Sequence, residues 1–226
     1  APTSKEQLEE GMSDILKLAF KDPSFSMVFI GFFSCGYQLA FITAHFPALV
    51  TEMSSPIDPS GWCGDLGIET TAALGGFSIS VIGFANILGT LLAGWAGKRY
   101  PRKWILSGIY AGRSIAAIWF ILTPITPNSI LIFSFAMGFL WLATVPLTSG
   151  LIAHIYGLKY MATLYGIVFF SHQLGSFTGV YLGGILYDIH GSYNFVWWVG
   201  IAAGIISALI HIPIREESRL KNLNKV

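Results

Sequence analysis

The chain has 226 residues, of which 54% are hydrophobic and only 11% are charged, and its formal net charge is +1. A soluble domain usually carries about 25% charged residues, so this composition excludes an ordinary soluble protein and indicates a membrane protein. The near-zero net charge argues against a nucleic-acid partner. Two cysteines without a C-x-x-C pattern predict neither a disulfide framework nor a metal site, and no cofactor is expected.

The predicted fold is an all-α membrane protein with six transmembrane helices. A spanning helix needs about 20 largely apolar residues. Six segments meet this condition, and in chain order they are 25–48, 70–97, 104–124, 129–153, 161–187 and 194–214. Residues 1–24 are expected to be a cytoplasmic linker with an interfacial helix, residues 25–214 a six-helix half-domain, and residues 215–226 a cytoplasmic tail. The polar, acidic start is unlike a signal peptide, and we expect a longer protein to precede it.

Basic residues alternate between the loops. Twelve of the thirteen Lys and Arg residues lie before the first span, between the second and third, between the fourth and fifth, or after the sixth. By the positive-inside rule both ends are expected in the cytoplasm of a multi-pass protein of the cell membrane. Cys63, in a loop on the other side, is then expected to react with an impermeant thiol reagent, whereas Cys35 is not.

The thirteenth basic residue, Arg113, lies within the third span. An arginine at mid-membrane costs about 2.5–3.5 kcal/mol on insertion scales, so something must offset this cost. Bulky Ile115 and Leu122 lie on the opposite helix face, which predicts that Arg113 points into the bundle. No Asp or Glu lies at mid-depth in any span. Its partner is therefore a backbone carbonyl, Asn86, His172, a group outside this chain or an anionic substrate, and its role is either substrate binding or bracing of helices.

Further polar residues within the spans complete a candidate substrate site. His172 is expected near mid-membrane, where a histidine can change charge near neutral pH, so it is a candidate for proton coupling or else a packing residue. Asn86 could bind substrate or join helices by a hydrogen bond. Pro146 should kink the fourth span. The candidate substrate-binding residues are Arg113, His172, Gln173, Asn86, Tyr37, Gln38, Thr144 and Thr148.

Two loops share a spacing that indicates an internal repeat. "GWAGKRYP" follows the second span and "GILYDIHG" follows the fifth, and each has a glycine, three residues, a charged residue and two residues before Pro101 or Gly191. The two loops are predicted on opposite sides of the membrane. Spans one to three and four to six are thus expected to be inverted three-helix repeats, which are a feature of secondary transporters.

The stretch "GWAGKRYPRKW" resembles the cytoplasmic loop motif of the major facilitator superfamily, Gly-x-x-x-Asp-Arg-x-Gly-Arg-Arg/Lys. The resemblance implies that the chain is the C-terminal six-helix half of a twelve-helix carrier, whose N-terminal half is a missing partner. The change of the acid to lysine puts in doubt the latch that the family's acid forms. The matching residues are Gly94, Arg99, Arg102 and Lys103, while Lys98 replaces the Asp and Pro101 the Gly.

"AFKDPSF" and "GGILYDIHGSYNFVWW" distantly resemble segments of the monocarboxylate-porter and oxalate/formate-antiporter branch. Those porters commonly carry an Asp and an Arg four residues apart in the eighth helix. The corresponding residues here are Asn86 and Thr90. Proton-coupled transport of the lactate type is therefore not implied.

These features favour a secondary active transporter that moves a small organic solute across the lipid bilayer by alternating access, and not an enzyme. The excess of buried cation over acid favours an organic anion. One alternative is a non-transporting six-helix membrane anchor or sensor. Another is an intramembrane serine hydrolase with Ser149 and either His154 or His172, although Ser149 lacks a preceding glycine and nothing marks an oxyanion hole.

Overall fold

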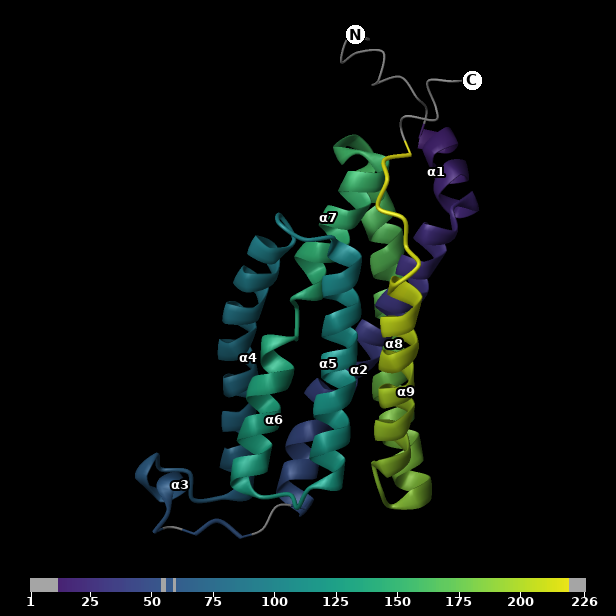
Figure 1. Cartoon of the computed structure of the whole chain (residues 1–226). Coiled ribbons are helices and arrows are strands. Elements are labelled where there is room, and N and C mark those ends of the chain that lie inside the picture. Colours follow the sequence, from purple (N-terminus) through teal and green to yellow (C-terminus); the bar gives the residue numbers. More distant parts are fainter. Residues whose placement is uncertain (1–11, 54–55, 59, 220–226) are drawn as a thin grey trace.

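The computed structural model describes residues 12–53, 56–58 and 60–219, and all regular elements in these ranges are α-helices. This confirms the all-α prediction for the described residues. Residues 1–11 of the expected linker and 220–226 of the expected tail lie outside them. The helices are α1 (Met12–Lys21), α2 (Pro23–Met53), α3 (Trp62–Asp65), α4 (Thr71–Ala96), α5 (Arg102–Leu122), α6 (Pro127–Phe139), α7 (Thr144–Tyr156), α8 (Leu158–His190) and α9 (Asn194–His211), and the long ones lie side by side in one bundle (Figure 1).

Five helical segments in the described part of the chain are long and apolar enough to cross a membrane. They are Pro23–Glu52, Thr71–Ala96, Arg102–Leu122, Pro127–Tyr156 and Asn194–His211. These segments agree with five of the six expected spans. The remaining expected span, 161–187, lies within α8, which has 33 residues and is not among the five. Its place in the membrane stays a prediction.

Capping residues and glycines define several helix ends. At the start of α6 the Thr126 side chain accepts a hydrogen bond from the Ser129 backbone while the Ser129 side chain accepts one from Thr126, and Pro127 occupies the first turn. This reciprocal capping box satisfies backbone N–H groups that have no partner within the helix. Gly157 (φ 88°) separates α7 from α8 and Gly191 (φ 63°) ends α8, because a positive φ suits glycine.

Helix α2 is the central helix of the bundle. It packs against α4, α8 and α9. Of the 18 most apolar consecutive residues, 67% are buried in α2, compared with 28% in α4. Its contact with α8 is a close backbone seam. A Cβ on Gly36 would lie 1.8 Å from the carbonyl oxygen of His172, and a Cβ on Gly175 would lie 2.0 Å from that of Phe33. Small residues therefore allow the two backbones to touch.

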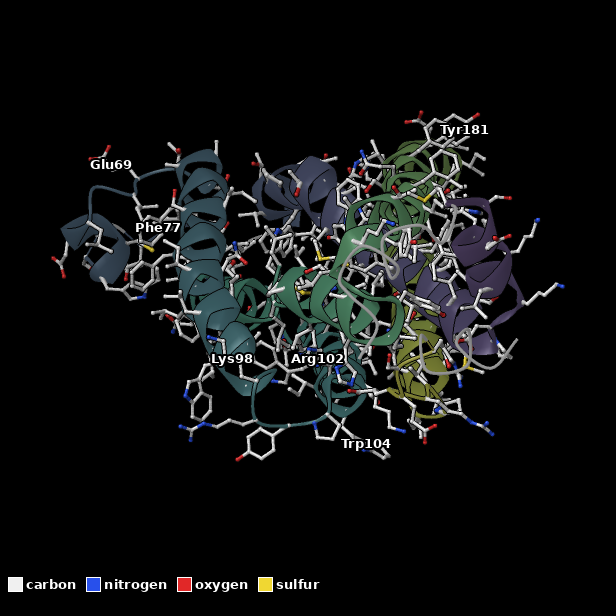
Figure 2. The ribbon with its side chains drawn as sticks, turned by 90° about the horizontal axis from the view of Figure 1, so that it is seen from above. Glu69, Phe77, Lys98, Arg102, Trp104 and Tyr181 are labelled. Carbon is white, nitrogen blue, oxygen red and sulfur yellow. The ribbon has the colours of Figure 1, made fainter. Side chains whose placement is uncertain are left out.

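The two ends of the bundle differ in charge. Helix α1, the α4–α5 turn and the α7–α8 turn lie at one end, and α3 lies at the other (Figure 1). We call the first the basic end, because it carries Lys98, Arg99, Arg102, Lys103 and Lys159. Seen from above, Lys98, Arg102 and Trp104 lie toward one edge of the bundle and Tyr181 lies at the opposite edge (Figure 2). The alternation of charge between loops thus becomes a segregation of charge in space.

Cys63 is less accessible than its loop position suggests. It lies in α3 and is only 4% exposed. The neighbouring Trp62 donates a hydrogen bond from Nε1 to Asn128 Oδ1 at 2.9 Å, which ties α3 to the first turn of α6. This burial argues against ready labelling of Cys63, and its labelling stays a prediction. Ser60, in the same loop, is exposed and is a better position for a reporter cysteine.

Candidate functional site

The fourth expected span is broken in the structure, which corrects the prediction of one kinked helix over 129–153. Helix α6 ends at Phe139 and α7 begins at Thr144, so residues 140–143 (the break) are not helical. Pro146 accounts for the position of the break, because its ring clashes with the carbonyl of the residue four positions earlier, Leu142, and it offers no N–H to that carbonyl. The disruption therefore falls one turn before the proline, and it leaves backbone groups that need other partners.

Arg113 supplies several of those partners. Its side chain is fully buried, and it donates from Nε to the Leu140 carbonyl at 3.0 Å and from Nη2 to the same oxygen at 2.6 Å. Nη2 also donates to the Trp141 carbonyl. The guanidinium lies 5.5 Å from the centre of the Tyr110 ring. Cationic donors at the C-terminal end of a helix also interact favourably with its dipole, so the backbone of the break offsets the cost of this intramembrane charge.

Asn86, on α4, also forms a hydrogen bond with the backbone of the break. Its Oδ1 accepts a hydrogen bond from the Leu142 backbone N–H at 2.9 Å and another from Thr90 Oγ1 at 3.2 Å. Asn86 and Thr90 thus form a neutral hydrogen-bonded pair. Beside them lies a surface hollow of about 370 Å³, lined by Asn86, Ile87, Thr90, Leu91, Leu142, Val145 and Pro146. The break thus opens a largely apolar recess with one amide and one hydroxyl.

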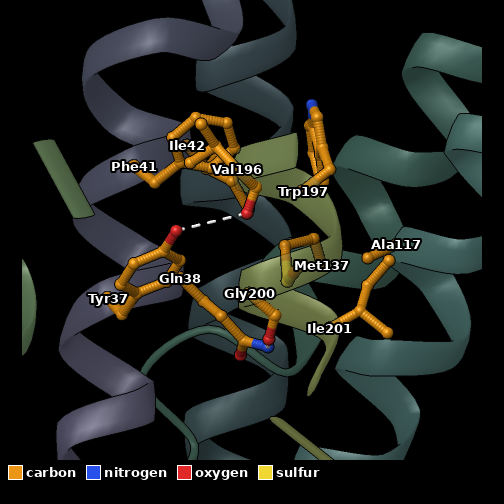
Figure 3. Close-up of a pocket in the computed structure, with 10 residues that line it drawn as sticks. All are labelled: Tyr37, Gln38, Phe41, Ile42, Ala117, Met137, Val196, Trp197, Gly200 and Ile201. Carbon is orange, nitrogen blue, oxygen red and sulfur yellow. Dashed lines mark hydrogen bonds between the residues drawn. The ribbon is translucent and has the colours of Figure 1, made fainter. Parts of the chain in front are cut away.

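Tyr37 and Gln38 lie deep between α2 and α9 (Figure 3). Tyr37 donates to the Val196 carbonyl at 3.2 Å, and Gln38 Nε2 donates to the Gly200 carbonyl at 2.9 Å. The cavity that they line together with side chains of α5, α6 and α9 has a volume of about 10 Å³. This is room for about one water molecule, so both residues join helices in this conformation and face no solute-sized space.

Thr144 and Thr148 are also directed into the core. Both are fully buried. Thr144 Oγ1 lies 3.3 Å from Cys35 Sγ, and Thr148 Oγ1 has no hydrogen-bond partner among the described residues. With Arg113, Tyr37 and Gln38 they make a set of five candidate residues that the structure places in the interior, which we call the interior group.

His172 and Gln173 are neighbours on α8, and the His172 ring also packs against Phe32 of α2 with ring centres 5.1 Å apart. Gln173 is exposed and His172 is half-buried, with His172 Nδ1 3.3 Å from Gln173 Oε1. The imidazole stacks on Phe169 with ring centres 5.1 Å apart. With the half-buried Asn86 they form the open group. No hydrogen bond in the described part of the chain joins Asn86 to either of them, so the structure brings Arg113 and Asn86 to one break and leaves His172 and Gln173 on a separate helix.

The loop-motif residues lie at the basic end with different contacts. The Arg99 guanidinium lies 4.5 Å from the centre of the Trp95 ring, and Arg102 lies close to Gly150 of α7. The Lys103 backbone N–H donates to Glu216 Oε1 at 2.6 Å, so Glu216 caps α5. A Cβ on Gly94 would meet no other atom within 4 Å, so packing does not require a glycine there.

An ion pair that the sequence did not reveal joins the linker to the tail. Asp22, between α1 and α2, is 7% exposed and accepts from Arg219 Nε at 2.8 Å, from Tyr156 OH at 2.9 Å and from the Ser24 N–H at 2.9 Å. Burial by itself would raise the pKa of Asp22, but the hydrogen bonds from Arg219, Ser24 and Tyr156 outweigh it and hold that pKa below its usual value. We call residues 212–219 the strap. The only sequence signal for this contact is an acid immediately before Pro23.

In the described residues no group of three or more His, Cys, Asp or Glu side chains is placed to hold a metal ion. The candidate site consists of a broken helix, a recess beside it and polar side chains on neighbouring helices. A broken helix at membrane depth is the arrangement in which many secondary transporters bind their solutes.

Comparison with known proteins agrees with this class. Residues 28–225 match the profile of the Major Facilitator Superfamily, and the chain belongs to that family. It is similar to "Uncharacterized MFS-type transporter YcxA" of Bacillus subtilis (strain 168), with 26% identity over 202 residues that cover 86% of this chain and 45% of the relative. It is also similar to "MFS transporter asaE" of Aspergillus flavus, with 29% identity over 201 residues that cover 84% of this chain and 41% of the relative. The chain thus spans less than half the length of either relative.

Proposed function

We propose that the chain is the C-terminal six-helix half of a secondary transporter that moves a small organic solute by alternating access. Its coverage of 45% and 41% of two relatives with transporter names supports the half-protein assignment. A missing N-terminal half would then face this bundle and complete the solute cavity within the lipid bilayer. The distant likeness to the monocarboxylate-porter branch is carried only by the short stretches quoted above.

Helix packing supports the proposed inverted repeats. In the proposal, α2, α4 and α5 form one triplet, and α6 with α7, α8 and α9 form the other. The first helix of each triplet packs on the second helix of the other, as α2 does with α8 and α4 with α6. The third helices, α5 and α9, pack on each other. This exchange of partners is what a two-fold relation between the triplets requires.

The observation that carries the transport proposal is the recess at the break. Its hollow of about 370 Å³ presents Asn86 and Thr90 next to backbone that is not helical. We also propose His172 and Gln173 as solute contacts and His172 as the proton-coupling residue. An organic anion remains the proposed substrate class, but we do not propose Arg113 as the group that meets its charge, because carbonyls and Cys35 already occupy the guanidinium.

Uptake by the full-length protein in proteoliposomes tests this proposal. A set of small carboxylates and their neutral amides should show uptake of at least one carboxylate, driven by an inward proton gradient. We expect Asn86→Ala to weaken uptake, and His172→Gln to keep exchange but lose accumulation driven by the gradient. Thr163→Ala, an exposed change on the same helix as His172, is the matched control. A folded protein that takes up no member of the set would favour the anchor or sensor alternative.

The hydrolase alternative gains no support from the site. The Ser149 hydroxyl donates to the Val145 carbonyl of its own helix at 3.0 Å, which is an ordinary helix contact. His172 lies next to Gln173 and Ser176 on α8. A serine-directed covalent probe should therefore leave Ser149 unmodified.

We further propose that the basic end faces the cytoplasm of a cell membrane. Ser60→Cys, made together with Cys63→Ser, should react with an impermeant thiol reagent in intact cells. Lys98→Cys, made with Cys63→Ser and with Ser60 unchanged, should react only after the membrane is permeabilised. The reverse pattern would invert the proposed orientation.

A further inference from the structure

A cavity of about 280 Å³ lies at the basic end, between the start of α2 and the strap, and the proposed transport site does not use it. The polar part of its wall consists of Asp22, Ser24, Arg215 and Arg219. The Arg215 backbone N–H donates to Ser24 Oγ at 3.2 Å, and the Arg219 backbone N–H donates to the Ile155 carbonyl at 2.9 Å. These bonds fix the strap to α2 and α7, so the fold itself holds the cavity open.

The cavity wall carries one positive charge that the protein does not neutralise. The Arg219 guanidinium donates to the two carboxylate oxygens of Asp22 at 2.8 and 3.3 Å, so these two charges cancel. Arg215 forms no ion pair with any residue that the structure describes. One carboxylate and two guanidinium groups leave a net charge of one cation, and a guanidinium suits a phosphate or carboxylate ligand.

The remaining part of the wall is apolar. Pro23 and Met27, one turn apart on α2, line the cavity together with Pro213 of the strap. Ile30 follows on the same face of α2, and Leu209 lies one turn before Pro213 on α9, and both side chains are exposed. Because α2 and α9 pack against each other, exposed apolar side chains on both helices continue from the cavity toward the middle of the bundle.

We propose that this cavity binds the phosphate headgroup of an anionic phospholipid, with an acyl chain lying along Ile30 and Leu209. The charge of Arg215 selects an anion, and basic pockets between membrane helices are known to hold such headgroups. The apolar side chains below the cavity favour a lipid over free phosphate, because inorganic phosphate has no apolar part to bury there. The site is separate from the recess at the break, and the proposal depends on neither the solute nor the direction of transport.

Lipid retention by the full-length protein in detergent, measured by native mass spectrometry, tests the proposal. Phosphatidylglycerol and phosphatidylcholine with the same acyl chains are added at equal concentration, and the protein should retain more of the anionic lipid. Arg215→Gln should lower retention of phosphatidylglycerol about fivefold, which is the contribution of one cation near a membrane surface. It should leave retention of phosphatidylcholine unchanged. Lys98→Gln, which removes one charge from the same end but outside the cavity, is the matched control and should behave as the unaltered protein does.

Three results would overturn the site. Equal losses in the two variants would mean that the lipid responds only to the overall charge of the basic end, and unchanged retention in Arg215→Gln would remove the arginine from the site. Displacement of the lipid by an equal concentration of inorganic phosphate would assign the cavity to a free anion instead. Arg215 and Lys98 are exposed, so both variants are expected to fold, and circular dichroism checks this. If Arg215→Gln does not fold, equal retention of the two lipids by the unaltered protein would still refute the proposal.

Discussion

The interior group and the open group are both polar, and both lie within predicted membrane spans, yet the structure uses them differently. Arg113, Tyr37 and Gln38 direct their donors at backbone carbonyls of neighbouring helices. Gln173 is exposed, and Asn86 lines a surface recess. A polar residue inside the membrane is therefore not by itself a solute contact. Its role depends on whether the surrounding backbone already needs its hydrogen bonds.

The difference arises from the break between α6 and α7. Lipid offers no hydrogen bonds, so a helix that stops at membrane depth must find partners for its last carbonyls inside the protein. A guanidinium has five N–H donors in a planar fork, and it can serve several carbonyls together. Arg113 meets this need at Leu140 and Trp141. Bracing, one of the two roles that the sequence left open for Arg113, is the one that this geometry supports.

The largest loss of stability is expected for Arg113→Gln, which tests whether the interior group stabilises the fold. This change removes the charge and most of the donors and leaves buried carbonyls and Cys35 without their partner, so we expect a loss of about 3–5 kcal/mol of unfolding free energy. Denaturation of the purified protein in detergent, followed by circular dichroism, measures it. Lys98→Gln, in the exposed α4–α5 turn, is the control and should change stability little. Normal stability with weakened solute affinity would move Arg113 into the open group.

A glycine change at the α2–α8 contact tests whether the backbones of the two helices pack as closely as the structure shows. In Gly36→Ala the new Cβ would lie 1.8 Å from the His172 carbonyl oxygen, so the helices must separate, and overpacking of this kind costs about 1–3 kcal/mol. Gly166→Ala on α8 is the matched control, because a Cβ there meets nothing within 4 Å. Thermal unfolding in detergent compares them. Equal midpoints for the two variants would contradict the close seam.

The buried ion pair of Asp22 extends the comparison to the basic end. Because the pKa of Asp22 is lowered in the folded protein, its stabilisation is complete above the unfolded pKa of about 3.9 and is lost as the pH falls through the lower folded value. We expect Asp22→Asn to cost about 1–2 kcal/mol at pH 7 and to flatten the acid limb of the stability curve. Denaturation midpoints from pH 7 to pH 3 measure this.

Glu217→Gln, an exposed change in the strap, is the control for Asp22→Asn and should leave that acid limb unchanged. An acid limb that Asp22→Asn does not alter would show that Asp22 contributes no pH-dependent stability.

The smallest effect on stability is expected for Gln173→Ala. The side chain is exposed, and within the described part of the chain its hydrogen bond is to the adjacent His172, so the change should alter unfolding free energy by no more than about 0.5 kcal/mol. Any effect should instead appear as a higher apparent KM for solute in proteoliposomes. A large loss of stability would show that Gln173 belongs with the interior group, and unchanged transport would remove it from the proposed site.

Local patterns in the sequence were enough for much of the fold. Long apolar runs predicted five segments that the structure also identifies, and the basic residues predicted which turns share an end of the bundle. These inferences succeed because length, hydropathy and residue size act within a single helix.

Partners that lie far apart in the sequence could not be predicted in this way. Composition marked Arg113 as costly and placed it inside the bundle, but Leu140 and Cys35 became its partners only when α2, α5 and the end of α6 packed together. Pro146 predicted a distortion of the helix. The extent of the distortion depended on the donors of Arg113 and on the side-chain oxygen with which Asn86 accepts the Leu142 N–H. The sequence alone therefore determined the membrane class, most of the spans and the direction of Arg113. The tertiary structure decided which polar groups are used within the protein and which remain free, because a hydrogen bond between helices depends on distances that no single helix contains.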